Sequence, residues 1–213
     1  MSRKAIAVAA ALLCLPVAGV PTPAAAATAA ITIADPGSVT AGTVTLRGSV
    51  GVSGNETTSV VYAIDATNST NNVTGMDCNG SGGADAGDDI NADGSVGDTL
   101  DCEIAAVNAL NTDLDQTAGA VQVGLVAFAN QASAADVDPS AATANLVDPG
   151  ATGGGSEPLI TTVAKNVWRD NIRQFTPTSL GGSGAGTAFD NAIGAALNVL
   201  SAAGPGPKWI MFL

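Results

Sequence analysis

The sequence VVYAIDATNST runs from an apolar segment into three oxygen-bearing side chains at alternate positions, Asp65, Thr67 and Ser69. One carboxylate with two hydroxyls is an oxygen-only ligand set of low charge. Such a set suits Mg²⁺ or Mn²⁺, because Mg²⁺ in particular keeps several of its waters. A glycine-rich stretch, GGSGAG, precedes Thr187 and offers a further hydroxyl. The alternative is that these residues form only a turn and a helix cap.

A second set of oxygen-bearing residues lies in the segment DDINADGSVGDTLDCE. Asp89, Asn91 and Asp93 occupy positions 1, 3 and 5 of an EF-hand-type loop, and Gly94 occupies position 6. In such a loop alternate oxygens surround a Ca²⁺ ion, and the glycine permits the sharp turn. Ser95 would contribute its backbone carbonyl at position 7. The pattern therefore predicts a calcium-binding loop, with a solvated acidic turn as the alternative.

This loop departs from the EF-hand pattern at position 12, where Leu100 stands in place of a glutamate. Asp98 or Asp101 must then close the ligand sphere, and Asp101 is preferred because it also opens the following helix. No helix is evident before the loop. It therefore resembles the isolated calcium loops of dockerin-like and thrombospondin-like repeats and not an EF-hand pair.

Residues 1–27 have the layout of a secretory signal peptide. Arg3 and Lys4 precede an apolar run, and small residues follow it. The run is too short for a transmembrane helix, so we expect a secreted or cell-surface protein without a transmembrane segment in this part of the chain. In that oxidising compartment the two remaining cysteines, Cys78 and Cys102, are predicted to form a disulfide.

The charge of the chain excludes several classes of function. Without residues 1–27 it keeps five basic side chains against nineteen carboxylates, a net charge of −14, and it has no histidine. Nucleic-acid binding is excluded because phosphate recognition needs a positive surface. A zinc site would need more cysteine or histidine. Most nucleophile–base pairs are also excluded, so we predict that the chain is not an enzyme.

One enzyme class is the least favoured alternative. A strand that ends in Asp-x-Thr also resembles the haloacid-dehalogenase-like phosphatases, in which the first aspartate is the nucleophile. Thr67 stands where those phosphatases usually carry their general acid.

The hydrophobic pattern predicts strands and helices in alternation, which is typical of an α/β fold with a mostly parallel sheet and helices on both faces, a Rossmann-like doubly wound arrangement. In such sheets ligands bind beyond the carboxyl ends of the strands. We expect a short β-rich extension at residues 28–56 and one α/β domain at 57–213. The predicted strands cover residues 60–64, 120–129 and 208–213, and the predicted helices cover 101–114, 156–175 and 186–204.

Four segments in this order resemble the motifs of a von Willebrand factor type A domain: VVYAIDATNST, VQVGLVAFA, GAGTAFDNAIGAAL and KWIMFL. The resemblance covers residues 60–213. It implies that Asp65, Thr67 and Ser69 form the Asp-x-Ser-x-Ser motif of a metal-ion-dependent adhesion site, with a threonine at the first serine position. It implies that Thr187 is the threonine of the second loop.

The resemblance also implies a function. A bound Mg²⁺ or Mn²⁺ keeps one coordination position open, and a carboxylate from a partner protein fills it. The family carries a further aspartate after its fourth strand, which is expected just beyond Leu213. The chain is therefore expected to be a C-terminally incomplete adhesion or protein-binding module. The alternative is a structural surface or matrix module in which metal ions serve stability alone.

The predicted calcium loop belongs to an insert, residues 70–101, between Ser69 and the first long helix. A disulfide between Cys78 and Cys102 would close this insert, which by the loop-entropy model stabilises it by roughly 3 kcal/mol. Calcium and the disulfide together would hold a segment that lacks the apolar residues for a core of its own. We hypothesise that the insert shapes the rim of the binding surface.

Overall fold

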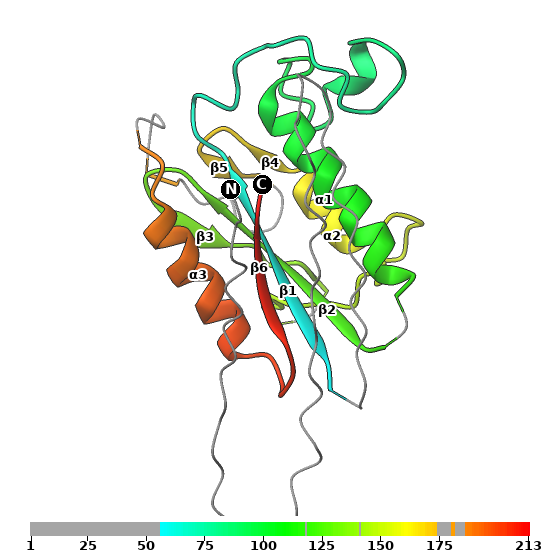
Figure 1. The fold of residues 1–213 in the computed structure, drawn as a ribbon, viewed down its shortest axis with the longest axis vertical. Helices are drawn as coiled ribbons and strands as arrows, with labels where there is room; N and C mark the ends of the chain where they lie inside the picture. Colours follow the sequence, from blue (N-terminus) through cyan, green and yellow to red (C-terminus); the bar gives the residue numbers. More distant parts are fainter. Residues whose placement is uncertain (1–55, 118, 141, 174–179, 182–185) are drawn as a thin grey trace, which may run out of the picture.

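The described part of the chain has an α/β fold, as the sequence pattern predicts, with α-helices packed on a mixed sheet of mostly parallel strands (Figure 1). The predicted signal peptide and nearly all of the predicted β-rich extension lie outside the described residues. The computed structural model describes residues 56–117, 119–140, 142–173, 180–181 and 186–213.

The order of elements follows the predicted alternation in most places and departs from it after the second long strand. In chain order the elements are β1 (Thr58–Asp65), the 3-10 helix η1 (Ala86–Asp88), α1 (Thr99–Asp115), β2 (Val121–Phe128), β3 (Ala132–Ala134), α2 (Leu159–Ala164), β4 (Val167–Trp168), β5 (Asn171–Ile172), α3 (Phe189–Ser201) and β6 (Lys208–Phe212).

The main sheet has the strand order β3-β2-β1-β6. β1 pairs in parallel with β2 and with β6, and β3 runs antiparallel to β2. In this register Asp65 lies opposite Phe128, and Ala63 lies opposite Phe212. The carboxyl ends of three parallel strands therefore meet at one edge, which we call the carboxyl edge of the sheet.

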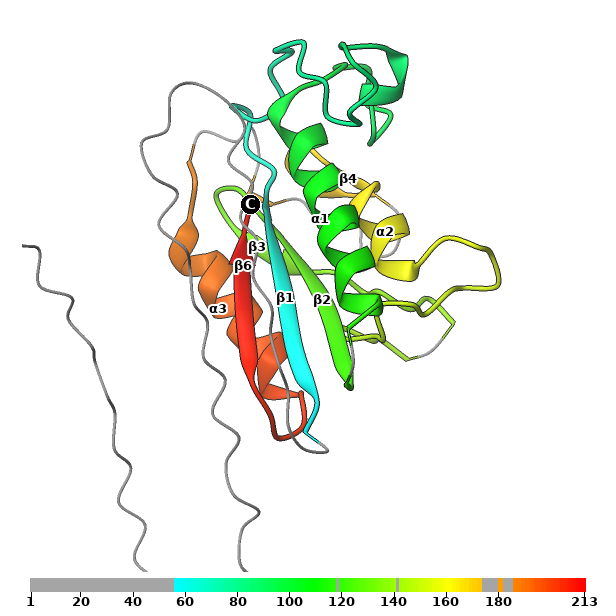
Figure 2. The ribbon, with the colours of Figure 1, turned by 45° about the vertical axis from the view of Figure 1, so that its right-hand side comes forward.

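The central strand β1 is buried on both faces, which explains why its sequence is apolar without alternation. Val60, Tyr62 and Ile64 belong to the core that α1 and α2 cover. Val61 and Ala63 point to the opposite face, where they pack with residues of α3. Figures 1 and 2 show α1 and α2 on one side of the sheet and α3 on the other.

The predicted first helix is confirmed as α1. Its buried residues Leu100, Ile104 and Val107 recur at helical spacing and belong to the core that it shares with β1 and β2. Asp98 is the N-cap, and Asp101 is the third residue of the helix. The expectation that Asp101 opens α1 is therefore corrected: Asp98 accepts the backbone N–H of Asp101, and Asp101 accepts that of Asp98, in a capping box.

The prediction of one amphipathic helix over residues 156–175 is wrong. The helix α2 has only six residues, and β4 and β5 follow it as an antiparallel pair. Arg169 and Asp170 form the turn between these two strands, and Asp170 has a left-handed φ of 61°. The physical reason is tertiary: the backbone N–H of Asp170 donates to the carbonyl of Ala66, and the carbonyl of Val167 accepts the amide of Asn91.

The other predicted elements are confirmed in their central parts. The strand predicted at residues 120–129 is β2, and the strand predicted at 208–213 is β6. The helix predicted at residues 186–204 is the shorter α3. β3 is an addition that the sequence pattern did not indicate.

We predict opposite effects on stability for two glycine-to-alanine substitutions. In β2, a Cβ on Gly124 would lie 2.4 Å from the carbonyl oxygen of Asn145 and 3.3 Å from Val199, so Gly124→Ala should lower the free energy of unfolding by about 1–3 kcal/mol. In α3, Gly194 has open space around it, and Gly194→Ala should raise that free energy by about 0.5–1 kcal/mol. Urea titrations of both variants test this, and a reversed order would contradict the packing of α3 on the sheet.

Candidate functional site

Four segments that are far apart in the sequence meet at the carboxyl end of β1. The backbone N–H of Ala66 donates to the carbonyl of Phe128 at 2.8 Å. Ala129, the residue after Phe128, accepts the backbone N–H of Ala188 through its carbonyl at 2.8 Å. The carbonyl of Ala66 accepts the N–H of Asp170 at 2.9 Å. The loops that follow β1, β2 and β4 and the loop that precedes α3 are thereby fixed to one another.

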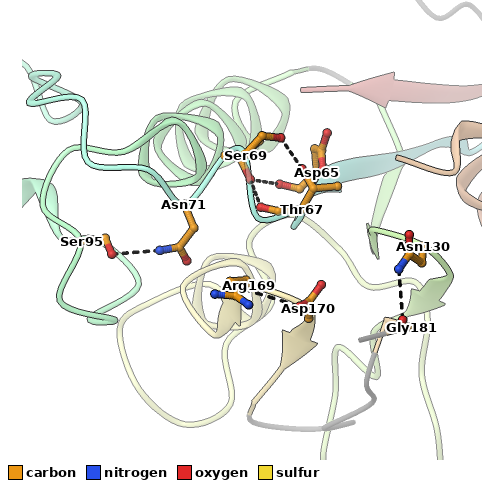
Figure 3. Close-up of polar contacts among 10 residues, drawn as sticks. Asp65, Thr67, Ser69, Asn71, Ser95, Asn130, Arg169, Asp170 and Gly181 are labelled. Atoms are coloured by element: carbon orange, nitrogen blue, oxygen red, sulfur yellow. Dashed lines mark hydrogen bonds and ion pairs between the residues drawn. The ribbon is translucent and has the colours of Figure 1, made fainter. Parts of the chain in front are cut away.

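The structure brings Asp65, Thr67 and Ser69 together on one turn (Figure 3). An Asp65 carboxylate oxygen accepts the backbone N–H of Thr67 at 2.9 Å, and the hydroxyls of Thr67 and Ser69 lie 2.8 Å apart. Thr70 closes the turn, because its hydroxyl donates to the carbonyls of Asp65 and Thr67, both at 2.9 Å. Thr67 is buried, Asp65 is half-buried and Ser69 is exposed, so the group opens to solvent on the side of Ser69.

Thr187 lies at the same edge but makes no side-chain hydrogen bond to Asp65, Thr67 or Ser69 in the described part of the chain. Its neighbour Ala188 is held against the end of β2, and Thr187 itself is exposed immediately before α3. The printed contacts therefore place the neighbour of Thr187, Ala188, against the end of β2.

Glu103 is a residue of this region that the sequence reasoning missed. It projects from the second turn of α1, and its Oε2 accepts the backbone N–H of Asp65 at 3.0 Å. Burial raises the pKa of Glu103 to about 8, and the charges of Asp65 and Asp98 add to the rise. The sequence shows acidic residues at the start of α1, but it does not indicate that the Glu103 side chain points to Asp65.

Asp170 is a second carboxylate that the sequence reasoning missed, because it fell within the helix predicted there. Its backbone contacts Ala66, and one carboxylate oxygen lies 3.6 Å from Nε of Arg169. The other oxygen, Oδ1, is buried and has no hydrogen-bond partner among the residues that the structure describes. Figure 3 shows Asp170 beside Arg169.

Asn130 extends the edge on the β2 side. Its side-chain amide donates to the backbone carbonyl of Gly181 at 3.1 Å. Its backbone carbonyl accepts the side-chain amide of Asn191 at 3.1 Å. A Cβ on Gly186 would lie 2.5 Å from Oδ1 of Asn130, so glycine is needed for this close approach just before Thr187.

The insert lies at the same end of the molecule as the carboxyl edge (Figure 1). The predicted disulfide is present: Cys78 and Cys102 are joined, with their Cα atoms 4.7 Å apart. Asp88 organises the segment next to it, because its carboxylate accepts the backbone N–H groups of Asp85, Cys78 and Asn79 at 2.8–2.9 Å. These hydrogen bonds lower the pKa of Asp88.

The predicted calcium loop is folded around its own acidic side chains. Asp89 accepts the backbone N–H groups of Asp93 and Gly94, the amide oxygen of Asn91 also accepts that of Asp93, and Asp93 accepts that of Ser95. No group of three or more acidic, histidine or cysteine side chains converges on one point in a metal-holding arrangement within the described ranges. A cation at the Asp65 turn or in the predicted calcium loop would therefore depend on hydroxyl, amide and carbonyl oxygens together with one or two carboxylates.

Comparison with known proteins gives no match: no family model, curated protein or solved structure corresponds to this chain. None of the helices in the described ranges is both long enough and apolar enough to cross a membrane.

We predict that Glu103 makes stability fall with rising pH. The pKa of Glu103 is raised from 4.5 to about 8, so between these values the folded chain holds a proton that the unfolded chain releases. The free energy of unfolding should therefore fall as pH rises through this window. Glu103→Gln keeps an acceptor for Asp65 and removes the titration, so the fall should be shallower.

Urea titrations across this pH window, in a chelator, test the prediction. Asp113→Asn is the matched control, because Asp113 is an exposed carboxylate on the same helix. An unchanged slope in Glu103→Gln would contradict the buried, protonated state of Glu103.

Proposed function

We propose that this chain is a secreted, metal-dependent protein-binding module of the von Willebrand factor type A class. In this proposal Mg²⁺ or Mn²⁺ is held by Asp65, Thr67, Ser69 and Thr187 and is bridged to a carboxylate of a partner protein. The observation that carries the proposal is the 2.8 Å pair of Thr67 and Ser69 hydroxyls on a turn capped by Asp65.

The donor set fits such an ion. The turn offers one carboxylate and two hydroxyls, which are hard oxygen ligands with little negative charge. A low ligand charge leaves the bound dication with a net positive charge, and that charge attracts an acidic partner group. The exposure of Ser69 and Thr187 supports the proposal because a partner carboxylate must reach the ion from solvent.

The fold also favours this place. Three parallel strands end at the carboxyl edge, with helices on both faces of the sheet, and ligands of such sheets bind beyond these strand ends. The backbone N–H of Leu213 donates to the carbonyl of Ala63 at 3.1 Å. Leu213 therefore lies next to the carboxyl end of β1.

Residues around the turn have supporting roles in this proposal. Glu103 fixes the backbone of Asp65 through its N–H, so it acts as a positioning residue. Asp170 brings a second carboxylate next to Ala66; its buried Oδ1 has no hydrogen-bond partner among the described residues, and in this proposal it would accept from a water of the hydrated ion. Neither role could be assigned from the family motif.

A structural module remains the second candidate, and a specific observation favours it. Asp65 accepts the N–H of Thr67, and the hydroxyl of Thr70 closes the same turn, which are the contacts that a turn makes without any ion. The two candidates differ in what a loss of the Asp65 charge does. The binding module loses ion and partner, whereas the structural module loses stability.

We predict that Mn²⁺ binding depends on the hydroxyl of Thr67. Thr67→Val keeps the shape of the buried side chain and replaces the hydroxyl by a methyl group, so it should abolish Mn²⁺ binding. Thr67→Ser keeps the hydroxyl and should bind Mn²⁺ like the native chain. The measurement is the electron paramagnetic resonance signal of free Mn²⁺ during a titration. Equal binding by the valine variant would exclude Thr67 as a ligand.

We further predict that the bound ion accepts an external carboxylate. Bound Mn²⁺ with an open position carries exchanging water and enhances water proton relaxation. Acetate should displace this water and lower the enhancement, and acetamide should not. Asp65→Asn, which keeps an acceptor for the Thr67 N–H, should lose both Mn²⁺ binding and the acetate effect, whereas Asp113→Asn should keep both.

Thermal unfolding of the same variants separates the two candidates. In the binding module Asp65→Asn unfolds at nearly the native temperature. A marked loss of stability in Asp65→Asn, with no acetate effect in the native chain, would favour the structural module.

A further inference from the structure

The exposed apolar side chains of the molecule gather at one place. The described residues have five exposed large apolar side chains, and four of these belong to α3 and β6: Phe189, Ile193, Leu197 and Phe212. The three residues of α3 are four positions apart, so they lie along one face of the helix. Exposed apolar side chains that gather in a patch mark interaction sites, whereas single ones are ordinary. We call these four side chains the apolar strip.

The apolar strip is continuous with the end of β6. The ring centroids of Phe189 and Phe212 lie 5.8 Å apart, and those of Phe212 and Phe128 lie 6.0 Å apart. Ile210 packs on the face of the sheet that α3 covers. Because successive side chains of a strand point to opposite faces, Lys208, Ile210 and Phe212 all point to the α3 face.

β6 is also an edge strand. It pairs with β1 and with no second strand in the described ranges (Figure 2). The carbonyl of Pro207 accepts the N–H of Ser59 at 2.9 Å, and the N–H of Leu213 donates to the carbonyl of Ala63 at 3.1 Å. In a parallel pair, alternate residues of a strand bond to the same neighbour. The residues of β6 whose N–H and C=O groups point away from β1 are therefore Lys208, Ile210 and Phe212.

The charge of Lys208 is turned away from this edge. A lysine on an edge strand commonly keeps other strands away. Here its Nζ donates to the carbonyls of Leu200 and Ala203, at 2.7 and 3.3 Å, and so caps the end of α3. The sequences of α3 and β6 contain one other charged residue, Asp190. These two elements therefore do not carry the strong negative charge of the chain.

The edge is complementary to itself. If two copies of β6 run antiparallel about a two-fold axis at Ile210, Lys208 of each copy lies opposite Phe212 of the other. These are the residues whose backbone groups point away from β1, so each opposed pair can exchange both of its hydrogen bonds. The charges also match: Asp190 follows Phe189, whose ring contacts Phe212, so Lys208 of one copy approaches the acidic end of the other.

We propose that two copies of this chain associate through their β6 strands, in an antiparallel pairing centred on Ile210. Such a two-fold contact is closed, because both copies use the same surface. The carboxyl edges with their Asp65 turns then point in opposite directions, and the pairing does not depend on what binds there. A five-residue strand makes a small interface, so the dimer is weak and forms as the protein concentration rises.

The experiment is sedimentation velocity over a range of concentrations, on the full chain with its disulfide intact and on two substitutions of Phe212. The native chain should shift from monomer to dimer. Phe212→Glu puts a carboxylate opposite Lys208 of the other copy, whereas Phe212→Lys puts a like charge there. The dimer dissociation constant of Phe212→Lys should be at least about 10-fold above that of Phe212→Glu, because two cross-strand pairs change sign. Net charge alone favours the reverse order, since Phe212→Lys makes an acidic chain less negative.

Val73→Lys is the matched control. Val73 is the fifth exposed large apolar residue, and it belongs to the insert and to neither α3 nor β6. Its substitution should leave the dissociation constant of the dimer unchanged. Far-ultraviolet circular dichroism verifies the fold of all three variants.

Amide hydrogen exchange, followed by nuclear magnetic resonance, tests the same contact in the native chain without a substitution. The N–H groups of Ile210 and Phe212 should become protected as the concentration rises. The N–H groups of Trp209 and Met211 face β1 and should be protected at every concentration.

Four outcomes would overturn the proposal. A monomeric native chain in which the N–H groups of Ile210 and Phe212 exchange freely would mean that the edge is solvated or serves a different partner. A monomeric chain in which they are protected would mean that another part of the same chain covers the edge. Equal dissociation constants for Phe212→Glu and Phe212→Lys would exclude the antiparallel register. Loss of the dimer in Val73→Lys would place the contact at the insert.

Discussion

β1 hydrogen-bonds to β2 on one side and to β6 on the other, in parallel, and both of its faces are covered by helices. A strand with no free edge and no exposed face can be solvated only at its ends. The first polar group that the chain meets at the carboxyl end is Asp65, and it is the half-buried member of an otherwise buried strand. The candidate site exists at this point because the parallel register brings the ends of three strands together there.

The second constraint is electrostatic. The chain has nineteen acidic and seven basic side chains, so most carboxylates cannot have a basic partner. In the insert the solution is local: Asp88, Asp89 and Asp101 accept backbone N–H groups, which supply partial positive charge. Asp98 and Asp170 each have one buried carboxylate oxygen that accepts no hydrogen bond from the described residues. Among the described residues these are the carboxylate oxygens that are buried without a hydrogen-bond partner.

The sequence predicted the long elements well because each has a strong local signal. The apolar run of β1, which has no polar alternation, and the helical spacing of Ile104 and Val107 in α1 depend on neighbours along the chain. The β4–β5 hairpin was not predicted, because distant segments hold it: the N–H of Asp170 donates to the carbonyl of Ala66, and the amide of Asn91 donates to the carbonyl of Val167. These contacts join residues whose proximity no local pattern encodes.

The sequence by itself determined that Asp65, Thr67 and Ser69 would stand together, since alternate residues after a strand share one turn, and that Cys78 and Cys102 would pair. Only the tertiary structure decided that Glu103 and Asp170 join the turn from α1 and from the hairpin. It also decided that Asp101 accepts four backbone N–H groups, whereas Asp98 accepts one through Oδ1 and none through Oδ2 among the described residues. The physical reason is common to both: local spacing fixes which side chains are neighbours on one segment, whereas burial and hydrogen bonding between segments fix which of their oxygens remain free.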